Sequence, residues 1–167
     1  MHGKTESAVL VPLFERDGRL HALFTKRRED LSRHPGEISF PGGRREDADP
    51  DLLTTALRET EEEIGLDRTR VTLAGALPPT PTFVTNYAIY PFVGIFEEDV
   101  ARAWIPQETE VAHILELAVA DVRAGYGRRR LVRRGIPFMT DTYEVDGNLI
   151  WGATARIVSD LLARIEE

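Results

Sequence analysis

The sequence contains no cysteine among its 167 residues, so disulfide bonds and thiolate metal ligands are excluded. It also lacks any run of about 18 apolar residues, the length that a membrane-spanning helix needs. An excess of positive charge is missing too: the formal net charge is −7, whereas a general nucleic-acid binder uses Lys and Arg to neutralise phosphates. These absences predict a soluble protein with neither a membrane partner nor a nucleic-acid partner, and they fit a cytoplasmic location.

The composition is that of an ordinary globular protein, with 42% hydrophobic and 29% charged residues. A chain of 167 residues fits one domain and buries roughly two thirds of its unfolded surface. We see no internal repeat, low-complexity run or linker in the sequence. We therefore predict a single domain over residues 1–167.

Strand and helix patterns alternate along the chain. Residues 7–14 and 20–25 predict a hairpin that turns at Asp17-Gly18, and Pro12 indicates an edge or a bulge in the first strand. Further strands are predicted over residues 37–40, 71–77, 88–96, 113–119, 128–134, 138–145 and 149–151. Helices are predicted over residues 50–64 and 154–165, with a short one near Asp121. This alternation predicts an α/β fold in which helices cover a mixed sheet.

The helix predicted from Pro50 to Ile64 has two different faces. Asp49 or Asp51 can cap its start, and Gly65 can supply the left-handed residue at its end. At about 100° per residue its core-facing stripe is expected to be Leu53, Leu57 and Ile64. The opposite face is free to line a cleft.

Three glutamates lie together on that second face. Glu59, Glu62 and Glu63 stand at i, i+3 and i+4, where like charges destabilise a helix by about 0.2–0.5 kcal/mol per pair. A divalent cation reverses this effect, because Mg²⁺ is held in proteins by carboxylates, waters and substrate phosphates. Gly42 and Gly43 precede the helix in a predicted tight loop, where glycine permits close approach to a phosphate or metal. Taken alone, the glutamates also fit an acidic helix exposed to solvent.

The segment from Gly43 to Leu66 resembles the Nudix box, whose family pattern is G-x5-E-x7-R-E-U-x-E-E-x-G-U with U apolar. The matching residues are Gly43, Asp49 and then Arg58-Glu59-Thr60-Glu61-Glu62-Glu63-Ile64-Gly65-Leu66. Asp49 stands where Glu is usual and one extra residue precedes Arg58, so a helix cap is the only role that the sequence assigns to Asp49. The resemblance implies the Nudix fold, an α/β/α sandwich with a mixed central sheet, and a diphosphatase, a hydrolase of acid anhydrides.

The resemblance also implies how the site is built. The ligands of Mg²⁺ or Mn²⁺ would be Glu59, Glu62, Glu63 and the Gly43 carbonyl. Arg58 lies off the metal face by the 100° count, so among the catalytic candidates we expect it to brace a glutamate rather than grip substrate. The general base would be a glutamate of the box, such as Glu62, or a later one, Glu110 or Glu108. We favour Glu110 because it precedes the strand expected from residue 111.

A second signature bears on the substrate. The segments Leu23-Phe24-Thr25-Lys26-Arg27 and Arg33-His34-Pro35-Gly36-Glu37-Ile38-Ser39-Phe40-Pro41-Gly42-Gly43 resemble the motif of the coenzyme A diphosphatase branch. Residues 85–94 and the run Ile150-Trp151-Gly152-Ala153-Thr154-Ala155-Arg156-Ile157 are also similar to that branch. Phe24, Arg28 and Ser32 depart from its motif. The resemblance implies cleavage of coenzyme A or acyl-coenzyme A into 3′,5′-ADP and 4′-phosphopantetheine. The alternative is a broader Nudix hydrolase acting on ADP-ribose or other nucleoside diphosphate derivatives.

Positive side chains gather just before the paired glycines. Charge-assisted contacts from this loop to a small nucleotide substrate are expected, although a solvated basic loop is the alternative for any one residue. The substrate-binding candidates are Arg27, Arg33, Lys26 and Gly42.

A later basic run, Arg128-Arg129-Arg130 with Arg133 and Arg134, is interpreted as a solvated face or a subunit contact, which leaves a homodimer open. It could also reach an acidic ligand. A non-catalytic binding module on the same fold is the alternative from another class. The intact set of Glu59, Glu62 and Glu63 argues against that module.

Overall fold

The protein is described by a computed structural model that covers residues 5–32, 35–82, 87–102 and 104–165. Arg33, predicted to bind substrate, lies outside the described residues. The strands are β1 (Thr5–Arg16), β2 (Arg19–Arg27), β3 (Ile38–Ser39), β4 (Gly42–Arg44), β5 (Thr72–Ala76), β6 (Thr80–Pro81), β7 (Tyr87–Ile95), β8 (Val111–Ala118), β9 (Tyr126–Arg133), β10 (Ile136–Val145) and β11 (Asn148–Ile150). The helices are α1 (Leu52–Ile64), α2 (Val119–Ala124) and α3 (Gly152–Leu162), with 3₁₀ turns η1 (Arg68–Arg70) and η2 (Glu98–Arg102). In this part of the chain no helix has the length and apolarity to cross a bilayer.

The main sheet is mixed. Its strand order is β3-β2-β1-β7-β5, in which β1 runs parallel to β7 and antiparallel to β2. The remaining members β4, β6 and β8 pair with β1, β7 and β2. A second, antiparallel sheet has the order β11-β10-β9. The predicted α/β fold with a mixed central sheet is confirmed.

The hairpin between β1 and β2 turns where the sequence predicts. Asp17 and Gly18 have φ values of 53° and 74°, the left-handed backbone that a two-residue hairpin turn requires. The edge-strand interpretation of Pro12 is wrong, because β1 lies in the middle of the sheet. On one side β1 pairs with β7 through residues 5–13; on the other it pairs with β4 through residues 7–9 and with β2 through residues 13–16. Pro12 lies between those two partners.

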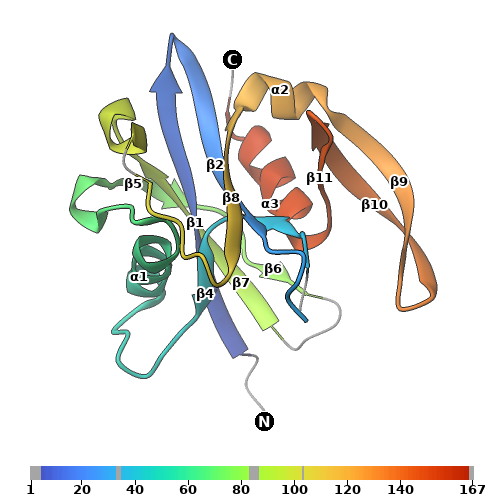
Figure 1. The fold of residues 1–167 in the computed structure, drawn as a ribbon, viewed down its shortest axis with the longest axis horizontal. Helices are drawn as coiled ribbons and strands as arrows, with labels where there is room; N and C mark the ends of the chain where they lie inside the picture. The colour runs from blue at the N-terminus through green and yellow to red at the C-terminus, as the bar shows by residue number, and fades with distance from the viewer. Residues whose placement is uncertain (1–4, 33–34, 83–86, 103, 166–167) are drawn as a thin grey trace.

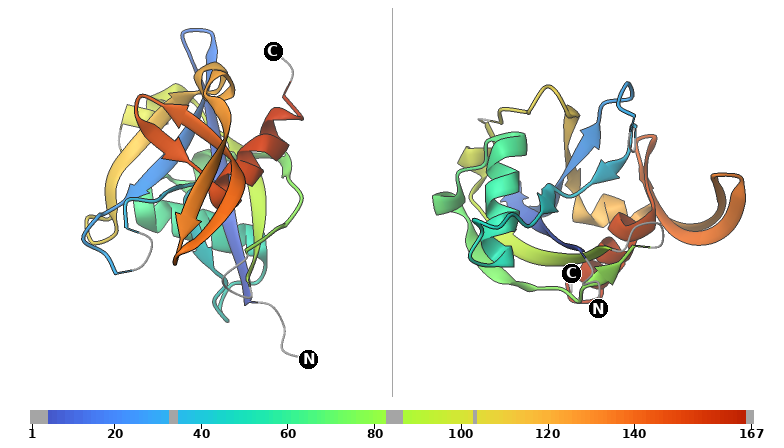
Figure 2. Two further views of the ribbon diagram at one scale, coloured as in Figure 1. Left: turned by 90° about the vertical axis from the view of Figure 1, so that its right-hand side faces the viewer. Right: turned by 90° about the horizontal axis from the view of Figure 1, so that it is seen from below.

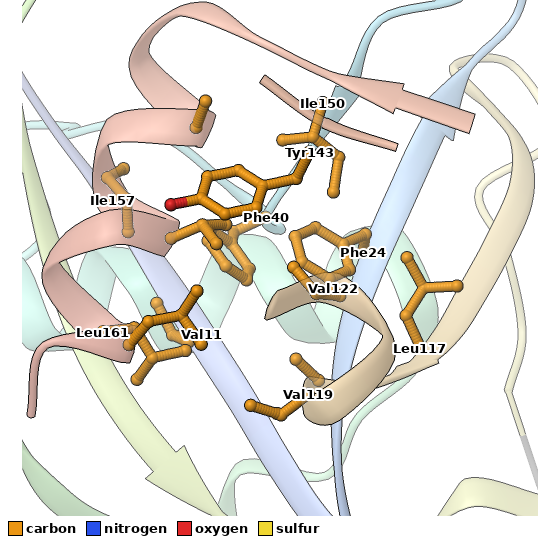
Figure 3. Close-up of a cluster of buried hydrophobic side chains, with 14 of the residues drawn as sticks. Val11, Phe24, Phe40, Leu117, Val119, Val122, Tyr143, Ile150, Ile157 and Leu161 are labelled. Atoms are coloured by element: carbon orange, nitrogen blue, oxygen red, sulfur yellow. The ribbon is translucent and has the colours of Figure 1, made fainter. Parts of the chain in front are cut away.

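Helices cover both faces of the main sheet (Figure 1). Because side chains alternate along a strand, Leu10 and Phe14 of β1 enter the core under α1, together with Ala56 and Ile64. Val11 and Leu13 enter the opposite core, under α2 and α3. Figure 3 shows the second core, where Phe40 lies among Tyr143 and Ile150 of the small sheet and Ile157 of α3. The arrangement of α1, sheet and α2 with α3 is the predicted α/β/α sandwich.

The core-facing stripe of α1 differs from the predicted one. Its buried residues include Ala56, Thr60 and Ile64, spaced four apart, whereas the predicted Leu53 is only partly buried. The Thr60 hydroxyl donates to the Ala56 carbonyl at 2.7 Å, which satisfies its polar group inside the core. A threonine can therefore occupy a core position of α1 that the sequence pattern did not include.

The β9–β10 hairpin, residues 126–145, projects from the body as an arm (Figure 1; Figure 2). Its root is fastened by β11, which pairs Ile150 with Tyr143. The arginine run predicted as an exposed face lies on β9, where Arg128, Arg129 and Arg130 are exposed. The arm matches the predicted final hairpin.

Candidate metal and catalytic site

The paired glycines lie in a strand rather than in the tight loop predicted for them. Gly42 and Gly43 belong to β4 and pair with Val9 and Ala8 of β1. A Cβ added to Gly42 would stand 2.3 Å from the Ala8 carbonyl oxygen, and one added to Gly43 would stand 2.6 Å from Cδ of Glu59. The absent side chains therefore allow β4 to approach β1 on one side and a carboxylate of α1 on the other.

Glu63 is the most perturbed carboxyl group of the site. Its Oε2 accepts a hydrogen bond from the Gly42 amide at 3.3 Å. Burial, and then repulsion from Glu59, raise the pKa of Glu63 to about 8. Burial also raises the pKa of Glu59. Two carboxyl groups crowded beside β4 thus resist ionisation when no cation is present.

Glu62 is more open to solvent, with 53% of its side chain exposed, and both of its carboxylate oxygens lie 3.4 Å from Nη1 of Arg58. Over the described ranges no three acidic or imidazole groups already converge as a complete set of metal ligands. The donors present, carboxylates next to a backbone that lacks a Cβ, are nevertheless the type that a hard dication such as Mg²⁺ prefers.

Arg58 is held between Asp49 and the glutamates. Its Nε and Nη2 donate to the two oxygens of Asp49 at 3.0 and 2.9 Å, and Nη1 donates to Oε1 of Glu59 at 3.1 Å. These contacts join Arg58 to Glu59, one of the glutamates that the sequence places on the metal face. A fork-to-fork pair of this kind fixes the orientation of the guanidinium group.

Asp49 has a larger role than the cap that the sequence assigned to it. The N-cap of α1 is Asp51, which accepts from the Thr54 amide at 2.7 Å. Asp49 is only 5% exposed and accepts also from the Thr55 hydroxyl at 2.8 Å. Hydrogen bonds from Arg58 hold the pKa of this carboxyl well below its usual range. The signal available in the sequence was the position of Asp49 in the box pattern.

A later loop is tied to the end of α1. The amide of Ile105 donates to the Ile64 carbonyl at 2.9 Å, and that of Gln107 donates to the Glu63 carbonyl at 2.8 Å. This brings Glu110, whose side chain is exposed, close enough to raise the pKa of Glu63. Glu108 is also exposed, and its carbonyl accepts from Nη1 of Arg28 at 3.0 Å. Of the two candidate bases of this loop, Glu110 is therefore the one that acts on the glutamate cluster.

Arg27 ends β2 opposite Val111, and its charge acts to lower the pKa of Glu63. Lys26 pairs with Ile38 of β3, one residue earlier. Arg28, a departure from the second signature, forms a two-pronged ion pair with Asp30. The structure thus gathers Arg27, Gly42, Gly43, Arg58, Glu59, Glu62, Glu63 and Glu110 around one place.

Comparisons with known proteins agree with this geometry. A family model described as the NUDIX domain matches residues 4–134. A protein called uncharacterized Nudix hydrolase NudL from Cronobacter sakazakii is 35% identical over 164 residues, which cover 97% of this chain and 83% of the relative. A protein of the same description from Escherichia coli is 33% identical over 162 residues, 96% of this chain and 82% of the relative.

Solved structures share the fold at low sequence identity. The NUDIX domain of Shewanella oneidensis NrtR, crystallised with ADP ribose, has a TM-score of 0.67 at 13% identity and covers 99% of this chain and 91% of its own. The Nudix hydrolase RenU from M. Smegmatis has a TM-score of 0.66 at 16% identity, covering 100% and 91%. The family match, the relatives and the glutamate-bearing helix beside β4 lead to one conclusion: this chain belongs to the NUDIX domain family and is a Nudix hydrolase.

Proposed function

We propose that the protein is a metal-dependent coenzyme A diphosphatase, which cleaves coenzyme A or acyl-coenzyme A into 3′,5′-ADP and 4′-phosphopantetheine. The observation that carries the proposal is that both segments of the second signature end near the glutamate cluster. Arg27 closes the first segment of that signature and its charge acts to lower the pKa of Glu63. Gly42-Gly43 close the second segment, and the Gly42 amide donates to Glu63. The coenzyme A motif and the Nudix box thus meet at one carboxylate.

The chain supplies the groups that such a reaction needs. Glu59, Glu62 and Glu63 would hold Mg²⁺ or Mn²⁺, with the Gly43 carbonyl as a further oxygen ligand. A bound dication supplies charge neutralisation on the phosphate oxygens and lowers the pKa of a bound water. Arg58 orients Glu59, and Arg27 places a positive charge beside the diphosphate. Glu110, at the solvent side of the cluster, is our choice for the general base, with Glu62 as the alternative.

A broader nucleotide diphosphatase is the second candidate. It is favoured by Arg28, which pairs with Asp30 where the coenzyme A motif has a small residue. The NrtR domain of the same fold binds ADP ribose. On this alternative, ADP-ribose or another nucleoside diphosphate derivative would be the better substrate.

The test is a substrate panel with purified protein and Mg²⁺ or Mn²⁺. Coenzyme A, acetyl-coenzyme A, ADP-ribose and a dinucleoside polyphosphate are compared by kcat/KM, with the products separated by chromatography. We expect 3′,5′-ADP from coenzyme A at the highest kcat/KM, and none from Glu62→Gln. Turnover of ADP-ribose without release of 3′,5′-ADP from coenzyme A would overturn the substrate assignment and leave the hydrolase.

A further inference from the structure

Trp151 belongs to a motif that the glutamate site does not use. Ile150, the residue before it, is fully buried in the core of α3, and Trp151 itself has an extended backbone, with φ −147° and ψ 177°. Because side chains alternate in extended chain, Trp151 faces away from that core. Gly152, the first residue of α3, has φ 66°, a left-handed conformation that glycine adopts without strain. The motif therefore holds a partly buried indole at the edge of the core.

Two side chains of the arm meet that indole. The ring of Phe138 lies 6.3 Å from the ring of Trp151, centroid to centroid, at an angle of 46°. The guanidinium carbon of Arg133 lies 5.6 Å from the centre of the Trp151 ring. All three side chains are partly exposed to solvent. We call Phe138, Trp151 and Arg133 the shelf.

The shelf and the glutamates flank the same segment. Ile150 and Tyr143, at the root of the arm, pack in one core with Phe40 (Figure 3). Phe40 lies two residues before Gly42, whose amide binds Glu63. β3 lies beside β11, and β4 lies beside α1. Residues 38–44 therefore run from beside β11, the strand that ends just before Trp151, to the proposed metal site.

We propose that the shelf binds the adenosine 3′-phosphate end of the substrate, an inference that rests on the function proposed above. Purine bases stack on Trp and Phe rings, because every base has a π-face. A guanidinium group can stack on a ring and bind a phosphate at the same time. With the diphosphate at the glutamates and the adenosine 3′-phosphate at the shelf, the two phosphate-bearing parts of one nucleotide would lie on the two flanks of residues 38–44.

A purely structural role makes a different prediction. If Trp151 and Phe138 only support the arm, substitution of Arg133 should change the KM equally for substrates with and without a 3′-phosphate. Dephospho-coenzyme A keeps the diphosphate and the adenine and lacks that phosphate. It is therefore the probe that separates the two roles.

The kinetic test uses Arg133→Gln in the full chain with Mg²⁺. We expect at least a tenfold rise in KM for coenzyme A, an unchanged kcat, and less than a threefold change for dephospho-coenzyme A. Arg130→Gln is the matched control, because Arg130 lies on the same strand with an exposed side chain. It should behave as the wild type with both substrates. Equal effects of Arg133→Gln on the two substrates, or no effect, would overturn the proposal.

A binding test does not depend on hydrolysis. The chain has two tryptophans, so Trp104→Phe leaves Trp151 as the only indole fluorophore. Titration with 3′,5′-ADP in EDTA should quench its emission to saturation, and adding Arg133→Gln should weaken the binding at least tenfold. If Trp104→Phe does not fold, the difference between wild type and Trp151→Phe gives the same signal.

The outcomes separate the two proposals. Saturable quenching without cleavage of coenzyme A would remove the proposed reaction and retain the nucleotide shelf. Cleavage of coenzyme A without quenching would retain the reaction and remove the shelf.

Discussion

Replacing Glu63 by Gln should stabilise the metal-free protein at neutral pH. Burial and the charge of Glu59 raise the pKa of Glu63 to about 8, from an ordinary value of 4.5. The folded state therefore holds this proton more tightly than the unfolded state, and stability falls as the pH rises from 4.5 to 8. At 1.36 kcal/mol per pKa unit, the loss due to Glu63 is about 3 kcal/mol at pH 7 and about 5 kcal/mol above pH 8. Gln cannot ionise and keeps an oxygen for the Gly42 amide.

The assay is urea denaturation in EDTA at several pH values between 4.5 and 8.5. The free energy of unfolding of the wild type should fall by several kcal/mol relative to that of Glu63→Gln as the pH rises through this range. Glu62→Gln is the matched control: its side chain is 53% exposed, so its curve should follow the wild type. Parallel curves for the wild type and Glu63→Gln would refute the reasoning, because Glu63 would then titrate equally in both states.

The stability that is lost when Glu63 ionises should be recovered when a metal ion binds. A ligand that binds only the folded state stabilises it by RT ln(1 + [L]/Kd), so Mg²⁺ or Mn²⁺ should raise the stability of the wild type at pH 8. It should raise that of Glu63→Gln much less. An equal gain in both proteins would mean that Glu63 does not bind the ion.

Three further substitutions test the surroundings of the cluster. Gly43→Ala places a Cβ 2.6 Å from Cδ of Glu59 and should weaken Mn²⁺ binding, measured by calorimetry, at least tenfold, whereas Gly127→Ala meets only Thr142 at 3.5 Å and should have no effect. Glu110→Gln should lower kcat by about 10²–10⁴-fold if Glu110 is the base, while Glu108→Gln should keep the wild-type kcat. A wild-type kcat in both variants would exclude a general base in this loop. Asp49→Asn releases Arg58 and should lower metal affinity or kcat by about 10–100-fold, and wild-type values for both would show that Arg58 holds its position without this partner.

Local patterns were enough to predict most elements of the fold. The turn at Asp17-Gly18 depends on residues adjacent in sequence, and the structure gives both the left-handed backbone that the pattern requires. The grouping of the glutamates on α1 follows from helix periodicity alone. The alternation of β9, β10 and β11 with their turns likewise needed no information from distant parts of the chain.

Two of the three errors arose where distant segments meet. Pro12 looks like an edge residue until β4 and β2 are seen to share one side of β1. The glycines were expected in a loop, because nothing in residues 42–43 tells that β1 pairs with them. A hydropathy pattern leaves Thr60 out of the core because its side chain is polar. In the structure its hydroxyl donates to the Ala56 carbonyl of the same helix, so Thr60 can be buried. For Pro12 and the glycines the deciding contact joins segments far apart in the sequence, whereas for Thr60 it is a bond within one helix.

Asp49 shows why a departure from the box pattern need not weaken the site. Asp is one methylene shorter than the usual Glu, and the loop that carries it is one residue longer before Arg58. The two changes act in opposite senses on the reach of the carboxylate, and both its oxygens still meet Arg58, at 3.0 and 2.9 Å. What the site requires is a buried carboxylate that fixes the guanidinium plane, because that plane sets the direction of the bond to Glu59. The spacing within the pattern can change as long as that fork is kept.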